Sequence, residues 1–510
     1  MRERAQSDVC LIVEGAYPYV IGGVANWLQD LMVSLPDLSF SIIAIKPDEK
    51  PLEWKIAPPS NVVEIVEVSL LPRTTGPRKY PSRAIERLAT ALLEFLTHGQ
   101  RAVLVEIIQE LSRLNPAPQV GDILSSPQMF ELFKRYYAQH CPAASFHHYF
   151  WAMRILLGGL LSMMLAPIPK ARVYHSLSTG FAGLLATRAT YETGRPAFLT
   201  EHGIYLLERQ IEVLMADWIG DQIESGLSLD REDSDLRDLW SRVFETYTRA
   251  CYEACDPIIS LYTANSLIQK RLGAPPERLK VIANGIDPEQ FPARLDERDP
   301  DHPLVALIGR VVPIKDIKTF IRAAAVVRKQ MPNARFVVLG PEDEDAHYSA
   351  DCRALVADLG IADVFSFAGR VNVGEWLPRI DVLCLTSLSE AQPLVILEAG
   401  IGGIPVVAPN VGSCREMIEG RDPSVDQPGG IITSLVAPED TARALLHLLR
   451  EPAEAARMGA TLQQRVRHDY DKASIVAEYR GLYRSLGAQA SSDVQASLLR
   501  AGRPARTKAA

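Results

Sequence analysis

Short apolar runs that alternate with helical segments constrain the fold of this chain more than any other feature. From Pro303 onward, each run rich in Val, Ile and Leu is followed by a segment with apolar residues at helical spacing. Strands that read as continuous apolar runs are typical of parallel sheets with helices on both faces. The runs are "PLVALIGRV", "ARFVVLGP", "VFSFAGRV", "DVLCLTSL", "PVVAPNVG" and "GGIITSLV". They predict an α/β, doubly wound domain.

The first half of the chain shows the same alternation with one interruption. Its opening run, "VCLIVEG", leads into a loop with Gly22 and Gly23 and then into a helical pattern, which is the usual start of a doubly wound domain. Residues 80–169 instead have helical spacing and little strand character, so we expect a helical insertion in this first domain. Further apolar runs are "FSIIAIKP", "VVEIVEVSLL", "ARVYHSLS", "PAFLTEHG", "PIISLYT" and "LKVIANGID".

A length of 510 residues predicts two domains. Residues 287–303 are acidic and broken by Pro, so they are the best linker candidate. We place the first domain at 1–290 and the second at 291–470. Residues 471–487 are expected to form a helix that packs back on the first domain, and the small, polar residues 488–510 are expected to be disordered.

The composition argues against several classes of protein. A formal charge of −8 gives no general attraction to nucleic acid. Seven scattered cysteines, an odd number, indicate a reduced, cytoplasmic protein. The first residues hold only a short apolar run, which predicts no signal peptide. The segment from Ile155, "ILLGGLLSMMLAPIP", is about half as long as a membrane span; it is interpreted as a buried helix or, alternatively, as a docking surface for a membrane-bound partner.

No metal site is predicted. Cys251 and Cys255 have helical spacing, but no second Cys or His pair accompanies them. Three Asp-x-Asp triplets lie in highly charged or Pro-broken stretches and are interpreted as solvated loops: 233–235, 299–301 and 343–345.

Several polar residues stand where parallel strands end. Arg310 and Lys315 follow the first strand of the second domain, where two cations suit a diphosphate; a solvated loop is the alternative. Gly22 and Gly23 would let backbone approach a ligand closely. His175 and His202 end two strands of the first domain, and either of them could instead be a structural histidine.

The stretch "SEAQPLVILEAG" separates two acids. Pro393 suits the first position of a helix, which leaves Glu390 in the loop before it, so that the free amides of Leu394 and Val395 face whatever Glu390 faces. Glu398 then lies inside an apolar helix, where a buried carboxylate needs hydrogen-bond donors. A vicinal diol such as ribose offers two donors. A salt bridge is the alternative, but no basic residue lies within a helical turn.

Taken together, these motifs resemble the retaining glycosyltransferases of family 4, which have the GT-B fold. The matching pieces stand in family order over nearly the whole chain: Gly22-Gly23, "LTEHG", "VIANGID", "IGRVVPIK", "VVLGP", "FSFAGRV", "SEAQPLVILEAG" and "GIPVVAPNVGS". The insertion and "LTEHGIYLLERQ" most resemble the subgroup that makes the Pel exopolysaccharide of biofilms. The resemblance implies a UDP-linked donor, no cofactor and no metal.

The resemblance also implies roles for individual residues. Arg310 and Lys315 would neutralise the donor diphosphate and the developing charge of the leaving group. Glu398 would bind the ribose hydroxyls, and Glu390, with the Leu394 and Val395 amides nearby, the hydroxyls of the donor sugar. Gly22 and Gly23 would let a loop close over the diphosphate and acceptor, and His202 would help to stabilise the transition state. The backbone around Gly369 and Arg370 would meet the base.

The implied reaction transfers a hexose or N-acetylhexosamine to a growing exopolysaccharide with retention of configuration, by front-face displacement. Expected partners are the UDP-sugar, the glycan acceptor and membrane-embedded synthase or export subunits, which would make the cytoplasmic chain peripheral to the inner membrane. Ala391-Gln392 departs from the Gly-aromatic pair common in the family. Alternatives are a non-catalytic subunit that binds nucleotide sugar, a glycogen-type synthase and a non-hydrolysing epimerase.

Overall fold

The computed structural model describes residues 6–215, 236–291 and 299–489, apart from residues 21, 77, 143 and 423. The chain divides into two compact units. Unit 1 comprises the chain up to Ser260, Ser266–Lys280 and the chain from Glu478; unit 2 comprises Leu261–Asn265 and Val281–Ala477. The division falls after Lys280 rather than after residue 290, because Ile286 already pairs with Asp471 of unit 2.

Unit 1 is built on a seven-stranded sheet of order β3-β2-β1-β4-β5-β6-β7. Neighbouring strands from β3 to β6 pair in parallel, with Val9 opposite Phe40 on one side and Val173 on the other. The strand order reverses between β1 and β4, which is where doubly wound sheets bind ligands. The strands are β1 (Ser7–Glu14), β2 (Phe40–Lys46), β3 (Val62–Ser69), β4 (Ala171–Ser176), β5 (Ala197–Glu201), β6 (Ile258–Ser260) and β7 (Leu279–Val281).

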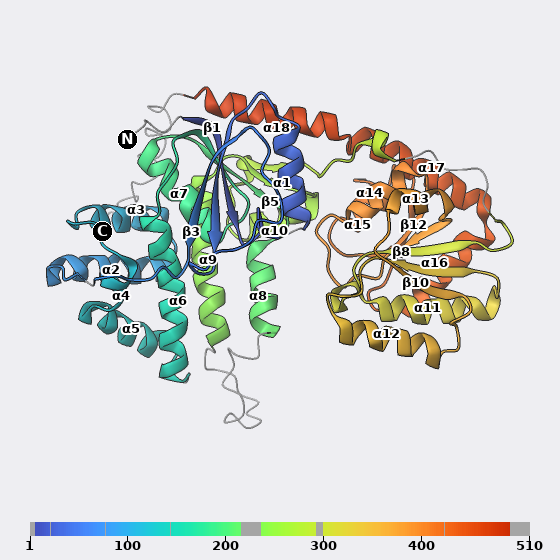
Figure 1. The fold of residues 1–510 in the computed structure, drawn as a ribbon, viewed down its shortest axis with the longest axis horizontal. Helices are drawn as coiled ribbons and strands as arrows, with labels where there is room; N and C mark the ends of the chain where they lie inside the picture. The colour runs from blue at the N-terminus through green and yellow to red at the C-terminus, as the bar shows by residue number, and fades with distance from the viewer. Residues whose placement is uncertain are drawn as a thin grey trace, which may run out of the picture. The chain divides into compact units, whose positions relative to one another are not determined.

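Helices α2 to α6 fill the chain between β3 and β4, the stretch for which the sequence predicts a helical insertion. Its helices gather beside α6 at one side of unit 1 (Figure 1). In α2, the apolar residues Ile85, Leu88, Leu92 and Phe95 recur at helical spacing and are buried. The helices of the insertion are α2 (Ser82–His98), α3 (Arg101–Ser112), α4 (Val120–Leu124), α5 (Pro127–His140) and α6 (Phe146–Leu165). The other helices of this half are α1 (Gly23–Val33), α7 (Phe181–Thr193), α8 (Tyr205–Met215), α9 (Leu236–Ala254) and α10 (Thr263–Arg271).

Helix α6 carries the segment that begins at Ile155. Among the described residues it is the one helix long and apolar enough to cross a membrane, and two-thirds (67 %) of its most apolar window is buried inside the protein. Leu156, Leu157, Leu160 and Leu161 are completely buried. The face that includes Leu160 therefore belongs to the core of unit 1, and the interpretation of that face as a docking surface is wrong.

Replacing Leu160 by alanine is expected to lower the free energy of unfolding by about 2–5 kcal/mol, because the substitution removes a fully buried side chain and leaves a cavity. Urea unfolding followed by tryptophan fluorescence measures the change. Ile211, which is half exposed on α8, serves as the control, and Ile211→Ala is expected to cost about 1 kcal/mol or less. Equal losses in the two variants would contradict the core position of Leu160.

The last described helix, α18 (Lys472–Gly487), packs on the sheet of unit 1 from Glu478 onward. The Tyr483 ring contacts Phe40 at 6.1 Å between centroids, and its hydroxyl hydrogen-bonds His175 Nδ1 at 2.8 Å. Arg484 forms an ion pair with Asp37 at 2.8 Å. Residues 490–510, for which disorder was predicted, lie outside the described residues.

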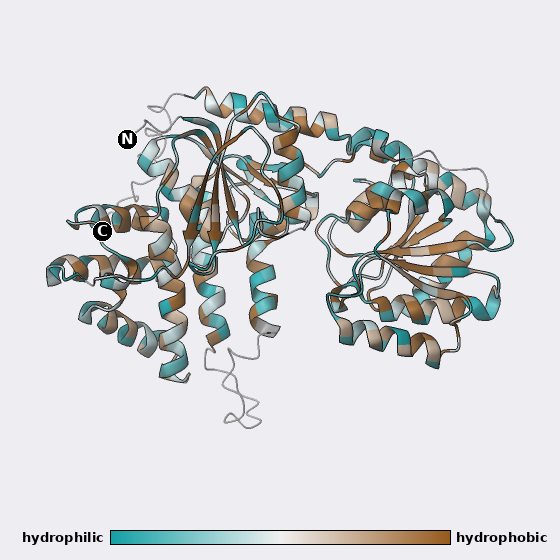
Figure 2. Cartoon of the chain, in the orientation of Figure 1, coloured by the Kyte–Doolittle hydropathy of each residue, from teal (hydrophilic) through white to brown (hydrophobic). Residues whose placement is uncertain are grey.

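Unit 2 has a six-stranded sheet of order β10-β9-β8-β11-β12-β13, and each of these neighbouring pairs is parallel. Both its faces are covered by apolar cores, and the strands are the most hydrophobic part of the unit (Figure 2). The predicted fold class, two doubly wound α/β domains, is thereby confirmed. The strands are β8 (Leu304–Ile308), β9 (Arg335–Leu339), β10 (Phe365–Gly369), β11 (Val382–Cys384), β12 (Val406–Pro409) and β13 (Gly430–Thr433). The helices are α11 (Ile317–Gln330), α12 (Ala346–Asp358), α13 (Val373–Trp376), α14 (Leu394–Ile401), α15 (Cys414–Glu419), α16 (Pro438–Arg450) and α17 (Pro452–Asp469).

Candidate active site

The strand order of unit 2 reverses between β8 and β11, so the loops after these two strands meet at the position where doubly wound sheets bind ligands. Hydrogen bonds hold the two loops together. The Thr386 hydroxyl donates to the carbonyl oxygens of Lys315 and Asp316 at 3.0 and 2.9 Å. The Leu388 amide donates to the Ile314 carbonyl oxygen at 2.8 Å. The geometry of this switch point is therefore fixed by a buried hydroxyl and by backbone groups rather than by exposed side chains.

Lys315 and Glu390 form an ion pair at the switch point. The distance from Lys315 Nζ to Glu390 Oε1 is 2.5 Å, and the side chains are only 22 % and 12 % exposed. The sequence predicted a phosphate ligand for the first residue and a sugar ligand for the second. The structure brings the two together, so that an ammonium and a carboxylate lie side by side at the switch point.

The turn after β12 holds the backbone beside Glu390. Gly412 has a φ of +54°, and a Cβ atom at this position would lie 2.1 Å from the Glu390 carbonyl oxygen. The Ser413 amide donates to the Ala391 carbonyl oxygen at 2.9 Å. Only glycine permits this close approach, and sequence reasoning did not identify Gly412 as part of the site.

Helix α14 begins at Leu394, so Pro393 lies just before the helix rather than at its first position. The predicted position was one residue off, because proline suits either position with its fixed φ. The amides of Leu394 and Val395 belong to the first turn, where no intrahelical acceptor exists. Glu390 lies in the preceding loop, as predicted, so these amides and the carboxylate belong to one short stretch of chain.

Glu398 lies inside α14 and is half-buried among apolar neighbours. Its Oε2 atom is buried and has no hydrogen-bond partner among the described residues. Burial raises the pKa of the carboxyl from 4.5 to about 6. A buried carboxylate oxygen without a donor is costly, and a ligand with hydroxyl groups would supply the donors. The alternative was a salt bridge, but Glu398 forms no ion pair within the described part of the chain.

Gln392, the residue that departs from the family pattern, has a structural function. Its side-chain Oε1 accepts from the Asn284 amide at 2.7 Å, and its Nε2 donates to the Asn284 carbonyl oxygen at 3.2 Å. This buried pair of hydrogen bonds fastens the segment "VIANGID" to the loop before α14. The two residues are 108 positions apart, so the sequence held no local signal for the contact.

Arg310 does not take part in the Lys315–Glu390 ion pair and has a different acidic partner. Its guanidinium pairs with Glu344 in the loop after β9, and both side chains are about half exposed. An exposed pair of this kind contributes little to stability. Arg370 is exposed directly after Gly369, whose φ is +67° and whose carbonyl oxygen accepts from the Gly340 amide at 2.9 Å. Both arginines stand at carboxyl ends of strands, as predicted, but neither contacts Glu390.

Gly22, Gly23 and His202 belong to unit 1, and their surroundings are described within that unit. A Cβ atom at either glycine would meet no atom within 4 Å. Gly22 precedes α1 with an extended backbone. Packing inside unit 1 therefore does not require glycine at these positions. Leaving space for a ligand would explain glycine at both.

The two histidines differ. His175 is a structural residue, because its Nδ1 pairs with the Tyr483 hydroxyl and its Nε2 with the Thr200 hydroxyl at 2.9 Å. His202 has a buried Nε2 atom without a partner among the described residues, and its ring meets Trp27 edge-on at 4.6 Å. Burial lowers the pKa of His202 to about 4. The imidazole is therefore neutral at pH 7 and offers a hydrogen bond rather than a positive charge.

Two acidic residues of unit 1 that sequence reasoning did not select make structural contacts. Glu14 ends β1 and accepts from the Phe181 amide at the start of α7 at 3.0 Å, while Tyr205 donates its hydroxyl at 2.7 Å. Glu201 is buried and accepts from Tyr252 and Gln269, each at 2.9 Å. Burial raises the pKa of Glu201 to about 7.

The candidate metal residues make ordinary contacts. The sulfur atoms of Cys251 and Cys255 are buried and lie 3.8 Å apart. Asp299 accepts from the ring of His302 at 2.7 Å, and Asp345 caps α12 by accepting from the Tyr348 amide at 2.9 Å. Within the described ranges, no group of three or more His, Cys, Asp or Glu side chains is arranged to hold a metal ion. Residues 233–235 lie outside them.

Family comparisons match both halves of the chain. Residues 7–277 match the family described as a domain of unknown function, DUF3492. Residues 302–451 match the family described as glycosyl transferases group 1.

Curated relatives match part of the chain. It is 33 % identical over 205 residues to a D-inositol 3-phosphate glycosyltransferase of Frankia alni, which covers 37 % of this chain and 48 % of that protein. A protein of the same name from Thermobispora bispora is 25 % identical over 314 residues, which cover 58 % of this chain and 72 % of that protein. The chain thus spans about half the length of the Frankia relative.

Solved structures match nearly the whole chain. Sucrose-phosphate synthase from Thermosynechococcus elongatus has a TM-score of 0.58 and 17 % identity, with 94 % of this chain and 99 % of that chain covered. HepE from Anabaena, solved in complex with UDP and glucose, has a TM-score of 0.55 and 14 % identity, with 94 % and 100 % covered. At these identities the likeness establishes the shared GT-B fold.

Proposed function

The chain belongs to the family described as DUF3492, and residues 302–451 of unit 2 match the group 1 glycosyltransferases. On that premise we propose that the chain transfers a hexose or an N-acetylhexosamine from a UDP-sugar to a growing exopolysaccharide with retention of configuration. The observation that carries this proposal is the switch point of unit 2. There the Lys315–Glu390 ion pair and the unpartnered Glu398 oxygen stand on loops and a helix that belong to one site.

Each part of that site suits one part of a nucleotide sugar. The Lys315 ammonium and the first amides of α14 suit the diphosphate, because the ammonium carries a positive charge and the amides donate hydrogen bonds from fixed positions. Glu398 suits the two ribose hydroxyls, and Glu390 suits the hydroxyls of the sugar. UDP as the nucleotide is supported by HepE, which has the same fold and was solved with UDP and glucose.

Retention would follow from a front-face displacement. The acceptor oxygen forms a bond to the anomeric carbon on the side from which the diphosphate leaves, the bond from that carbon to the phosphate oxygen breaks, and the leaving phosphate takes the acceptor proton. Lys315 would offset the charge that develops on the phosphate, so no metal is needed in this scheme. In unit 1, Gly22 and Gly23 would leave room for the acceptor, and the neutral His202 would donate or accept a hydrogen bond.

The exopolysaccharide acceptor is the finer part of the proposal. The insertion and "LTEHGIYLLERQ" favour the Pel polysaccharide of biofilms, made in the cytoplasm with membrane-embedded synthase or export subunits as partners. Screening UDP-glucose, UDP-N-acetylglucosamine and UDP-N-acetylgalactosamine for UDP release tests the transfer, and NMR of the anomeric proton of the product tests retention. UDP binding without consumption of any donor would instead indicate a non-catalytic subunit, and an inverted product would exclude the front-face scheme.

Uridine affinity is expected to rise about tenfold from pH 5 to pH 7 and then to level off. The Glu398 carboxyl has a pKa of about 6, and ribose hydroxyls bind its ionised form, whose fraction grows about tenfold over that range. Calorimetric titration with uridine, which carries no phosphate, measures the effect. Glu398→Gln is expected to abolish the rise and to weaken binding at pH 7. A rise that persisted in Glu398→Gln would assign the titration to another group.

A further inference from the structure

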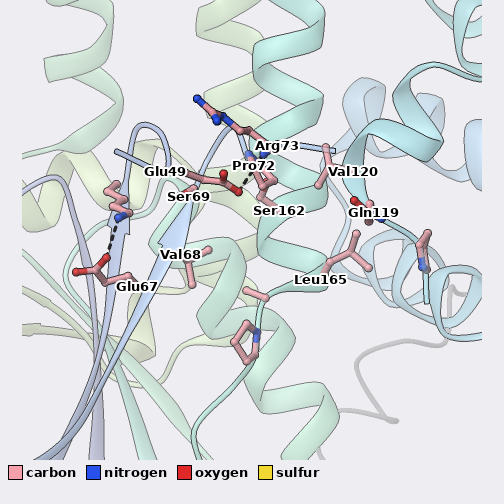
Figure 3. Close-up of a pocket in the computed structure, with 14 residues that line it drawn as sticks. Glu49, Glu67, Val68, Ser69, Pro72, Arg73, Gln119, Val120, Ser162 and Leu165 are labelled. Atoms are coloured by element: carbon pink, nitrogen blue, oxygen red, sulfur yellow. Dashed lines mark hydrogen bonds and ion pairs between the residues drawn. The ribbon is translucent and has the colours of Figure 1, made fainter. Parts of the chain in front are cut away.

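A cavity of about 440 Å³ lies in unit 1 where the helical insertion meets the edge of the sheet (Figure 3). Lys46 and Ser69, which end β2 and β3, line one side of it. Residues 118–120, at the start of α4, and residues 162–167, at the end of α6, line the other side. We call this cavity the insertion pocket. It opens at the carboxyl ends of parallel strands, the edge at which α/β domains bind ligands.

Two charges of the insertion pocket, on the buried Lys46 and the exposed Glu67, form an ion pair. Lys46 Nζ lies 2.7 Å from Glu67 Oε2, and the Lys46 side chain is 7 % exposed. The same ammonium donates to the Lys50 carbonyl oxygen at 3.2 Å. The hydrogen bond from Lys46 lowers the pKa of Glu67, so the Glu67 carboxyl stays ionised at neutral pH. The Lys46 ammonium is nearly buried and contacts both the Glu67 carboxylate and the Lys50 carbonyl oxygen, so it is less accessible to a phosphate or an acidic sugar than Lys315, whose side chain is 22 % exposed.

The rim of the pocket is polar, and one wall is apolar. The Glu49 carboxylate accepts from the Arg73 amide at 3.0 Å, while the Arg73 side chain is exposed. Figure 3 shows these two residues on one side of the cavity and Val68 and Leu165 on another. The side chain of Gln119 is held by hydrogen bonds of 2.8 and 2.7 Å to the backbone of Thr75. The Glu49 carboxylate and the Gln119 amide are therefore held in place at the opening, beside the exposed Arg73 side chain.

We propose that the insertion pocket binds a neutral oligosaccharide and holds the part of the glycan acceptor that is remote from the reacting hydroxyl. This rests on the proposed function. A sugar chain presents hydroxyls, which match carboxylate and guanidinium groups, and C–H faces, which match an apolar wall. The cancelled charges of Lys46 and Glu67 favour a neutral ligand over an ionic one. The pocket volume lies in the range typical of small-ligand sites.

Saturation-transfer NMR and calorimetry on the full chain without UDP test the proposal, with cellotetraose and N-acetylchitotetraose as probes. At least one probe is expected to bind saturably, and the Glu49→Ala/Arg73→Ala double variant to bind it at least tenfold more weakly. The matched control is Glu131→Ala/Arg135→Ala, which removes the same residue types from a separate cavity of about 310 Å³ between α2 and α5. The control is expected to bind like the parent chain.

Four outcomes would overturn the proposal: no binding of either probe, equal binding by the double variant and the parent chain, equal weakening in the control, or tighter binding of tetragalacturonate, an anionic comparison.

A kinetic measurement separates this proposal from the transferase proposal. If the chain is a transferase and the pocket holds acceptor, the double variant raises the acceptor KM at least tenfold and leaves the KM for the UDP-sugar unchanged. Transfer with an unchanged acceptor KM would overturn the pocket alone; oligosaccharide binding without any transfer would overturn the transferase alone.

Discussion

Replacing Lys315 by alanine is expected to lower kcat/KM for the UDP-sugar by about 10²–10³-fold. The Lys315 ammonium is fixed at the switch point by its 2.5 Å contact with Glu390 and by the hydrogen bonds of its own loop to Thr386. A cation held in this way would need no rearrangement to offset the charge that forms on the leaving diphosphate. Its removal should therefore raise the barrier to transfer and weaken UDP binding together.

Steady-state kinetics and calorimetric titration with UDP measure the two effects of Lys315→Ala. The matched control is Lys318→Ala, on the neighbouring helix, which loses an ion pair with Asp351 whose side chains are 30 % and 46 % exposed. A partly exposed pair contributes about 0–1 kcal/mol, so the control should keep both its kinetics and its UDP affinity. Unchanged UDP affinity in Lys315→Ala would show that the diphosphate binds elsewhere.

Replacing Glu390 by glutamine is expected to lower kcat by about 10²-fold while UDP affinity changes little. The carboxylate lies in the loop before α14, beside Lys315 and under the turn at Gly412. In the proposed function this carboxylate positions the sugar rather than the nucleotide. Glutamine keeps the shape but loses the charge, so it holds the sugar hydroxyls less firmly, while its amide oxygen can still accept a hydrogen bond from Lys315 and keep that ammonium in place.

Comparison of two ligands isolates the role of Glu390. UDP lacks the sugar and the UDP-sugar carries it, so only the second should bind more weakly to Glu390→Gln. Glu344→Gln is the control, because that residue pairs with Arg310 in a half-exposed position away from the switch-point ion pair. A Glu390→Gln protein that consumed donor at the parent rate would exclude a role for this residue in transfer.

Lys315 and Glu390 illustrate what the sequence can and cannot predict. Alternating apolar runs predict the strands of both sheets, because burial between two helix layers demands such runs. The same reasoning placed Glu390 in a loop and Glu398 inside a helix, as the structure has them. A local pattern does not say which loops meet. That depends on strand order, and the ion pair from Lys315 to Glu390 spans 75 positions.

Other features also arise only from the assembled fold. Gln392 stands where the family often has an aromatic residue, and its contact with Asn284 gives this glutamine a structural function. Arg310 and Lys315 were predicted to share a ligand, and the fold gives them different partners, Glu344 in the loop after β9 and Glu390 in the loop before α14. The insertion pocket needs the end of β3 and the end of α6 in one place, and these lie far apart along the chain.

A crystal structure of the chain with UDP tests the central claim most directly. The ribose hydroxyls are expected to donate to the Glu398 carboxylate, and the phosphate oxygens to accept from the first amides of α14 and from the Lys315 ammonium. UDP bound away from the switch point of unit 2, or bound there with its ribose turned away from Glu398, would contradict the assignment of this site.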